Sequence, residues 1–162
     1  MFNVGESVVY GINGVCRIES IGVLDMDGMP KDKEYYTLCP VFSNRSKVFA
    51  PVDNTRIVMR GVMSESEAKH LLDELPKLPE LSITSEKLRE CEYKEAIKSC
   101  DCYIIAKMLK TIKHRMNERI AQGKRVTAND EKYFRIAEDK LLSELSISLG
   151  KNKDEVKKWI NY

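Results

Sequence analysis

The fold of the first half of the chain is decided by residues 7–21, which read Ser7-Val-Val-Tyr-Gly-Ile-Asn-Gly-Val-Cys-Arg-Ile-Glu-Ser-Ile21. Two runs rich in β-branched and aromatic residues are separated here by a turn that contains Gly11 and Gly14. Such runs between turn-forming residues are typical of β-strands. We therefore expect strands over residues 7–10 and 15–21.

Two further runs, at residues 34–38 and 47–52, have the same composition and also lie between turn-forming residues. Strands at this spacing favour a small barrel of about five strands, because closure of a sheet leaves few exposed edges. Pro51 has no amide hydrogen to donate, so it is expected at the edge or the end of a strand.

The periodicity changes to that of helices after about residue 62. Ser64-Glu-Ser-Glu67 has the pattern of a capping box, which starts a helix that must stop at Pro76. Glycines end two of the later helices. We predict these later helices at residues 84–98, 101–121, 127–149 and 154–160.

The two patterns together predict an α+β protein. A β-barrel is expected over residues 1–62, and an all-α bundle of four to five helices over residues 63–162. The segment at residues 76–82, which contains Pro76 and Pro79, is expected to be a stiff hinge.

Composition excludes several classes of protein. The 162 residues are 43% hydrophobic, which is enough for a core, but no apolar run approaches the roughly 18 residues of a membrane span. The chain does not start with a basic segment and an apolar stretch, so no secretion signal is expected. The five scattered cysteines are therefore expected to be reduced thiols in the cytoplasm.

The positive charge is concentrated in one region. The formal net charge is only +2, but residues 83–125 hold 11 basic and 6 acidic side chains. A local surplus of this kind suits contacts with nucleic-acid phosphates. It equally suits a solvated helix face with ordinary ion pairs such as Glu90 with Lys94. Charge alone leaves both interpretations open.

No pattern in the sequence is typical of an enzyme. The glycine-rich phosphate and dinucleotide loops and the serine nucleophile elbow are all missing. His70 and His114 have no neighbouring nucleophile and no spacing that suggests metal ligands. We therefore expect no catalytic residues, no metal site, no cofactor and no small-molecule substrate.

Several motifs resemble the CarD family of bacterial transcription regulators. The match extends over nearly the whole chain, from strands to helices. Its motifs are Phe2-x-Val-Gly-x-x-Val-Val-Tyr10-Gly-x-x-Gly-Val15, Pro51-x-x-Asn54, Arg60-Gly-Val-Met-Ser64, Tyr93-Lys-Glu-Ala-Ile-Lys-Ser-Cys-Asp101, Lys107-Met-Leu-Lys110 and Thr127-Ala-x-Asp130-Glu-Lys-Tyr-Phe134. The N-terminal motif alone also resembles the related module of transcription-repair coupling factors.

The resemblance implies a Tudor-like or SH3-like barrel that binds the β subunit of RNA polymerase through a strand edge. Backbone hydrogen bonds give affinity in this mode, and alternate side chains give specificity. On this sequence the implied edge runs from about Val23 to Met26 and includes Leu24, with Lys47 and Phe49 on a strand beside it.

The resemblance also implies that the helical half contacts promoter DNA at the upstream edge of the transcription bubble, without reading its sequence. In the family a tryptophan wedges into the minor groove there. The matching position here is about Ser82, next to Ile83, and a serine cannot fill an unstacked base step. Basic residues for phosphate contacts remain, namely Lys87, Arg89, Lys94, Lys124 and Arg125.

The leading hypothesis is a non-enzymatic, cytoplasmic regulator that RNA polymerase brings to the nucleoid, where it modulates the stability of the open complex. The missing wedge motivates an alternative of another class. In that alternative the chain is a polymerase-bound adaptor whose helical half binds another protein and does not contact DNA. Neither hypothesis has a role for a membrane.

Overall fold

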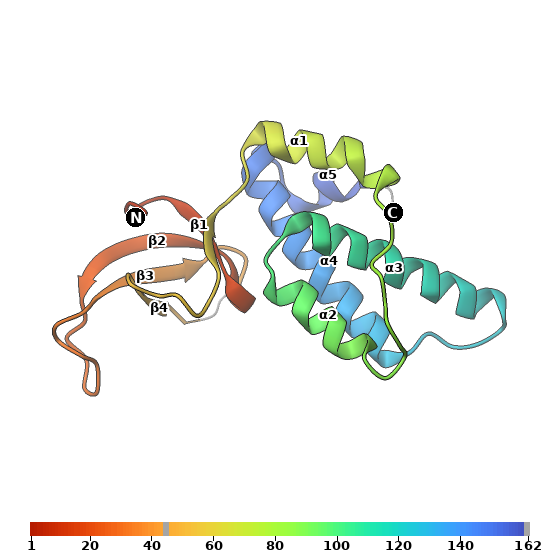
Figure 1. The fold of residues 1–162 in the computed structure, drawn as a ribbon. Coiled ribbons are helices and arrows are strands. Elements are labelled where there is room, and N and C mark those ends of the chain that lie inside the picture. The colour runs from red at the N-terminus through yellow and green to blue at the C-terminus, as the bar shows by residue number, and fades with distance from the viewer. Residues whose placement is uncertain (44–45, 161–162) are drawn as a thin grey trace. The chain divides into compact units, whose positions relative to one another are not determined.

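The computed structural model describes residues 1–43 and 46–160. The chain divides into two compact units, Met1–Val62 and Met63–Tyr162 (Figure 1). The described residues of the first unit form one five-stranded sheet, and those of the second unit form helices. The predicted α+β class, with strands followed by helices, is confirmed.

The strands of the first unit pair in the antiparallel order β4-β3-β2-β1-β5. Four of them lie where the sequence predicts strands, and the fifth pairs with β1. Their bounds are Ser7–Tyr10 (β1), Gly14–Val23 (β2), Glu34–Pro40 (β3), Val48–Pro51 (β4) and Met59–Gly61 (β5). Pro51 ends the edge strand β4, as its missing N–H group requires. Among the described residues β4 and β5 are not paired with each other, so backbone hydrogen bonds do not close this sheet into a ring.

The inner face of the sheet holds a small apolar core. Val8, Cys16, Leu38 and Ala50 are fully buried, and they come from four different strands. The ring of Phe2 packs edge-on against Tyr36, with 6.3 Å between the ring centroids. This contact ties the N-terminal segment to β3.

Gly11 joins the end of β1 to the segment before β5. Its φ of +46° is unfavourable for residues with a side chain, and its N–H donates to the carbonyl of Val58 at 2.9 Å. A Cβ atom at this position would lie 2.6 Å from Cγ2 of Ile57. Both the backbone conformation and the close approach therefore require glycine.

The described residues of the second unit form five α-helices. They are Glu65–Glu74 (α1), Arg89–Lys98 (α2), Cys102–Ala121 (α3), Ala128–Leu149 (α4) and Lys153–Lys157 (α5). Side chains cap four of their N-termini, and the capping box of Ser64 with Glu67 is confirmed. Gly150 ends α4 in the left-handed conformation, as predicted.

The helical core lies between α1, α3 and α4. Leu71, Leu109, Ile112, Leu141 and Leu145 are fully buried there. The apolar side chains of α3 therefore belong to the core over most of its length. At its C-terminal end, however, Ile120 is 60% exposed and lies outside this core.

One helix start differs from the prediction. The second helix was expected to begin at Thr84 or Ser85, but α2 begins at Arg89. Residues 85–88 instead form a separate turn in which the N–H of Leu88 donates to the carbonyl of Ser85 at 3.1 Å. The N–H of Thr84 donates a hydrogen bond to the carboxylate of Glu92 at 3.1 Å. This turn places residues 86 and 87 before the helix rather than within it.

We predict that Gly11→Ala destabilises the N-terminal unit by at least about 1–2 kcal/mol, because alanine must adopt the same positive φ and approach Ile57. Thermal unfolding followed by circular dichroism measures the loss. Gly22→Ala is the matched control, since Gly22 lies in β2 with open space around its Cα. Equal melting temperatures for the two variants would contradict this account of Gly11.

Candidate functional site

The second half of β2 has a partner strand on one side only. β1 pairs with β2 as far as Arg17, and on this side Ile18 still forms backbone hydrogen bonds with residues 5 and 6, at 2.8 and 2.9 Å. On the other side β3 follows β2 to Val23, which lies opposite Glu34. Beyond Ile18, β2 thus has an open edge within the described part of the chain.

The pairing pattern shows which backbone groups face this edge. The N–H of Val52 donates to the carbonyl of Glu34 at 3.0 Å, so the backbone groups of Glu34 point toward β4 and away from β2. Val23, opposite Glu34, is consequently a non-hydrogen-bonded partner whose N–H and C=O point away from β3. The same alternation turns the N–H and C=O of Ile21 outward.

The edge is apolar as well as unpaired. The side chain of Val23 is 55% exposed, Met26 is exposed and Leu24 is half-buried. Only Val23 belongs to a strand, because β2 ends there and residues 24–26 continue without strand structure. The predicted edge from Val23 to Met26 therefore begins two residues earlier, at Ile21, and its regular part is short.

The second predicted part of this surface lies on a different edge. Phe49 sits in β4 opposite Thr37 of β3, and its N–H and C=O also point away from β3. The expectation that Phe49 lies beside Val23 is wrong, because β3 stands between β2 and β4. Lys47 precedes β4, and its ammonium group forms an ion pair with Glu19 of β2.

The segment at residues 76–82 is not a hinge between the two units. Their boundary lies at residue 62, and this segment is held on α3 within the helical unit. The ammonium group of Lys110 donates to the carbonyls of Pro76 and Leu78, both at 2.7 Å, and the hydroxyl of Thr111 accepts from the N–H of Leu81 at 2.7 Å. These long-range contacts cannot be predicted from two prolines.

The two residues at the wedge position have different environments. Ser82 is exposed, whereas Ile83 is half-buried and packs against the helical core. Ile83 is therefore held within the protein, and an apolar side chain directed outward is missing at this position.

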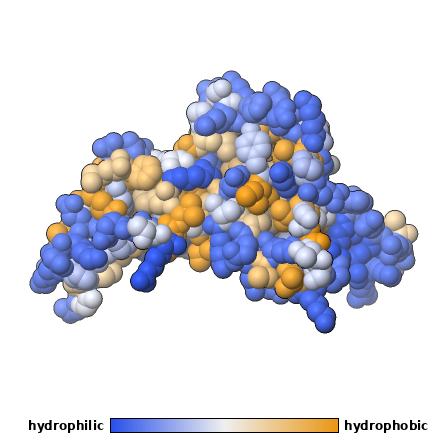
Figure 2. All heavy atoms as spheres, viewed as in Figure 1, coloured by the Kyte–Doolittle hydropathy of each residue, from blue (hydrophilic) through white to orange (hydrophobic). Residues whose placement is uncertain are grey.

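The five basic residues predicted to contact phosphates divide into two groups. Lys87, Lys124 and Arg125 are exposed. Arg89 and Lys94 instead form ion pairs, with Glu86 at 2.7 Å and with Glu90 at 3.0 Å. The end of α3 and the loop before α4, which carries Lys124 and Arg125, are strongly hydrophilic on the face shown in Figure 2.

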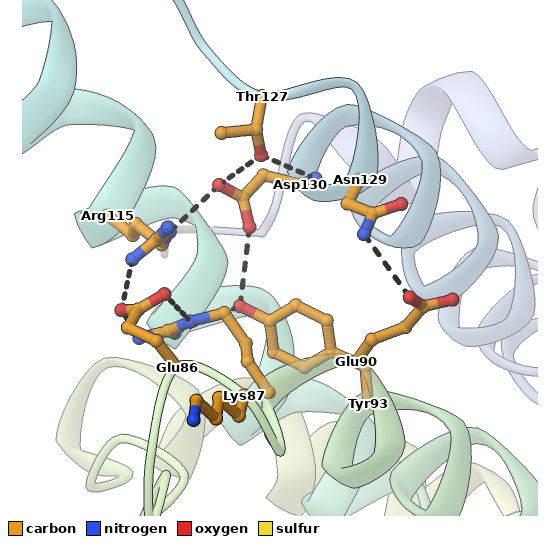
Figure 3. A pocket seen from close by; sticks show the side chains of 9 residues that line it. Glu86, Lys87, Glu90, Tyr93, Arg115, Thr127, Asn129 and Asp130 are labelled. Atoms are coloured by element: carbon orange, nitrogen blue, oxygen red, sulfur yellow. Dashed lines mark hydrogen bonds and ion pairs between the residues drawn. The ribbon is translucent and has the colours of Figure 1, made fainter.

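Around Arg89 the helices enclose a hollow of about 250 Å³ lined with charged groups (Figure 3). Asp130 of α4 is almost completely buried, at 1% exposure. Its carboxylate accepts hydrogen bonds from Arg115 of α3 at 2.9 Å, from the hydroxyl of Thr127 at 2.7 Å and from the hydroxyl of Tyr93 of α2 at 3.5 Å. One buried carboxylate thus joins three helices.

The arginines of this hollow also share a second carboxylate. Oε1 of Glu86 lies 2.7 Å from Arg89 and 2.7 Å from Arg115. The bond from Arg89, and then that from Arg115, lowers the pKa of Glu86 despite partial desolvation. Desolvation opposes the charge of Arg115, but its bond to Asp130 raises its pKa above the usual value. Glu86 and Arg115 are therefore both ionised near neutral pH.

The comparison with protein families decides the nature of the sheet unit. Residues 2–63 match the family model of the CarD-like/TRCF RID domain. This match covers nearly all of the N-terminal unit. The resemblance to CarD-like proteins is confirmed for the N-terminal unit, and the Tudor-like fold expected for a RID domain agrees with the five antiparallel strands. None of the curated proteins compared matches the chain.

The RID domain implies an interaction with RNA polymerase, and its family consists of protein-interaction domains rather than enzymes. Within residues 1–43 and 46–160 there is no group of three or more His, Cys, Asp or Glu side chains that could hold a metal ion. No helix in the same ranges is long and apolar enough to cross a membrane. Cys16, Cys100 and Cys102 are buried, Cys39 is half-buried and Cys91 is exposed.

The sequence did not indicate the hollow itself. From the sequence, Arg89 is predicted only as a phosphate-contacting cation, and Arg115 counts only toward the surplus of positive charge in residues 83–125. The motif that contains Thr127 and Asp130 has the form of a helix cap, and this is the one local signal, because a capping residue followed by an acid marks the first turn of a helix. The partners of Asp130 lie 15 and 37 residues away, beyond the reach of local patterns.

We predict that Asp130→Asn destabilises the helical unit by about 2–4 kcal/mol, because Arg115 loses the charge that compensates its partial burial. Chemical unfolding followed by the helical circular dichroism signal measures this change. Glu95→Gln, which removes an exposed carboxylate paired with Lys98, is the control and should not alter the unfolding midpoint. An equally small effect of Asp130→Asn would show that the network contributes little.

Proposed function

We propose that this protein is a transcription regulator that binds the β subunit of RNA polymerase through the RID domain and contacts promoter DNA through the helical unit. It would act in the bacterial cytoplasm and would associate with the nucleoid through its binding to RNA polymerase. The observation that carries the first half of the proposal is the open edge of β2, where Ile21 and Val23 present unpaired backbone groups beside exposed apolar side chains.

An edge of this kind fits strand addition. A partner strand would supply acceptors and donors to Ile21 and Val23, while Val23, Leu24 and Met26 would give it apolar contact. Two paired residues make only a short ladder, so the apolar side chains must contribute much of the affinity. Lys47 and Phe49 belong to the β4 edge, which is a second candidate for the same role.

Proline substitutions separate the two edges. Val23→Pro removes an outward N–H without breaking a β2–β3 hydrogen bond, and we expect at least about a tenfold loss of affinity for the polymerase β subunit. Phe49→Pro makes the same change on β4 and is the matched control. Affinity is measured by biolayer interferometry with the full chain. If Phe49→Pro alone weakens binding, the docking edge is β4; if neither does, strand addition is wrong.

The DNA-binding half of the proposal rests on exposed cations. Lys87 lies at the mouth of the charged hollow, and Lys124 with Arg125 lies in the loop before α4. Each could neutralise a phosphate without reading a base. Arg89 and Lys94 contribute less, because acidic partners already hold them. With Ser82 at the wedge position we expect phosphate contacts near the bubble and only weak stabilisation of the open complex.

Tethering makes such weak contacts sufficient. Once the RID domain is bound to the polymerase, the helical unit is confined near the promoter at a high effective concentration. Contacts too weak to bind free DNA can then shift the stability of the open complex. The alternative function, a polymerase-bound adaptor without DNA contact, predicts no such dependence on cations.

A salt series distinguishes the two functions. We predict that Lys87→Ala lowers the slope of log affinity against log salt by about one unit for fork-junction DNA, because one phosphate contact is lost. Fluorescence anisotropy measures the slope. Lys69→Ala, which removes a lysine of α1 paired with Glu65, should leave it unchanged. DNA binding that does not depend on salt, or none at all, would favour the adaptor.

A further inference from the structure

The carboxylate of Glu86 forms ion pairs with two arginines whose guanidinium groups converge on it. Its Oε1 accepts from Nη2 of Arg89 and from Nη1 of Arg115, each at 2.7 Å, and its Oε2 accepts from Nε of Arg89 at 3.2 Å. Two guanidinium groups from different helices thus converge on one carboxylate. Forked donors in this arrangement match the oxygens of a phosphate as well as those of a carboxylate.

The arginines are fixed by other partners on their remaining sides. Nη1 of Arg89 donates to the hydroxyl of Tyr93 at 3.2 Å, and Nε of Arg115 donates to the buried carboxylate of Asp130 at 2.9 Å. Their side chains are only 18% and 23% exposed. Both guanidinium groups would therefore keep their places if Glu86 moved away.

Glu86 itself is held much less firmly than its partners. Its side chain is 64% exposed, and it belongs to the turn before α2 rather than to a helix. Because most of this carboxylate is already in water, a competing anion can approach the two arginines and take its place. In Figure 3 Glu86 lies between Arg115 and the turn that carries Lys87, whose ammonium group lies apart from the network of dashed lines.

We propose that Arg89 and Arg115 form a binding site for a phosphate group, and that Glu86 occupies this site as an exchangeable internal ligand. When Glu86 is displaced, the hollow of about 250 Å³ has room for the incoming group, and Lys87 at its mouth adds a third cation. The phosphate belongs either to a DNA backbone or to a free phosphate compound. Only the first source rests on the DNA contact proposed above.

Removal of the charge of Glu86 tests the site. Full-length Glu86→Gln should bind inorganic phosphate and duplex DNA about fivefold more tightly than the wild-type chain, because the competing anion is gone. Isothermal titration calorimetry measures the first affinity and fluorescence anisotropy the second. In the same variant, phosphate should shift the Nε–H NMR signals of Arg89 and Arg115. Glu86→Ala is the second variant and should bind at least as tightly.

Glu90→Gln is the matched control. Glu90 lines the same hollow and carries the same charge, but it pairs with Lys94 and Tyr133 instead of the two arginines. An equal gain in Glu90→Gln, or no gain in either Glu86 variant, would overturn the proposed site. Tighter binding of inorganic phosphate but not of DNA would support the site and assign it to a free phosphate compound. If the Glu86 variants change the affinity for neither phosphate nor DNA, the site is wrong, but the general DNA contact can still stand without it.

Discussion

The difference in length between β1 and β2 constrains the N-terminal unit more than any other feature. Every strand has backbone donors and acceptors that need partners, and β1 has four residues whereas β2 has ten. The register between β2 and β3 shifts between Ile18 and Ser20, where pairing with the β1 side ends. Among its described residues the RID domain therefore presents an apolar edge without a partner strand, and such an edge is a ready template for pairing with another chain.

The helical unit depends on a different constraint, which is the cost of a buried charge. Asp130 is almost completely buried, so it must be compensated by hydrogen bonds and an opposite charge. Arg115, Tyr93 and Thr127 supply these, and in doing so they fix the first turn of α4 against α2 and α3. The same network sets the positions of the arginines that meet Glu86, so stability and the proposed anion site share their residues.

Much of the architecture was predictable because its signals are local. Alternating and β-branched runs predicted β1 to β4, and the caps at Ser64, Thr127 and Gly150 predicted where helices begin or end. The proline-rich segment at residues 76–82 is not the predicted hinge, and the reason is physical. Prolines show that a helix must stop, but whether the following chain is free depends on distant groups, here Lys110 and Thr111, which hold this segment on α3.

The sequence by itself determined the order of strands and helices, the turns and helix ends that glycines form, and the family resemblance of the N-terminal unit. Each of these depends on residues close together along the chain. Only the tertiary structure decided that Val23 and Phe49 lie on different edges, that Arg89 is paired while Lys87 is exposed, and that Glu86 bridges two arginines. Strand order, burial and the convergence of charges depend on contacts between residues far apart in sequence. Local sequence patterns do not predict these contacts.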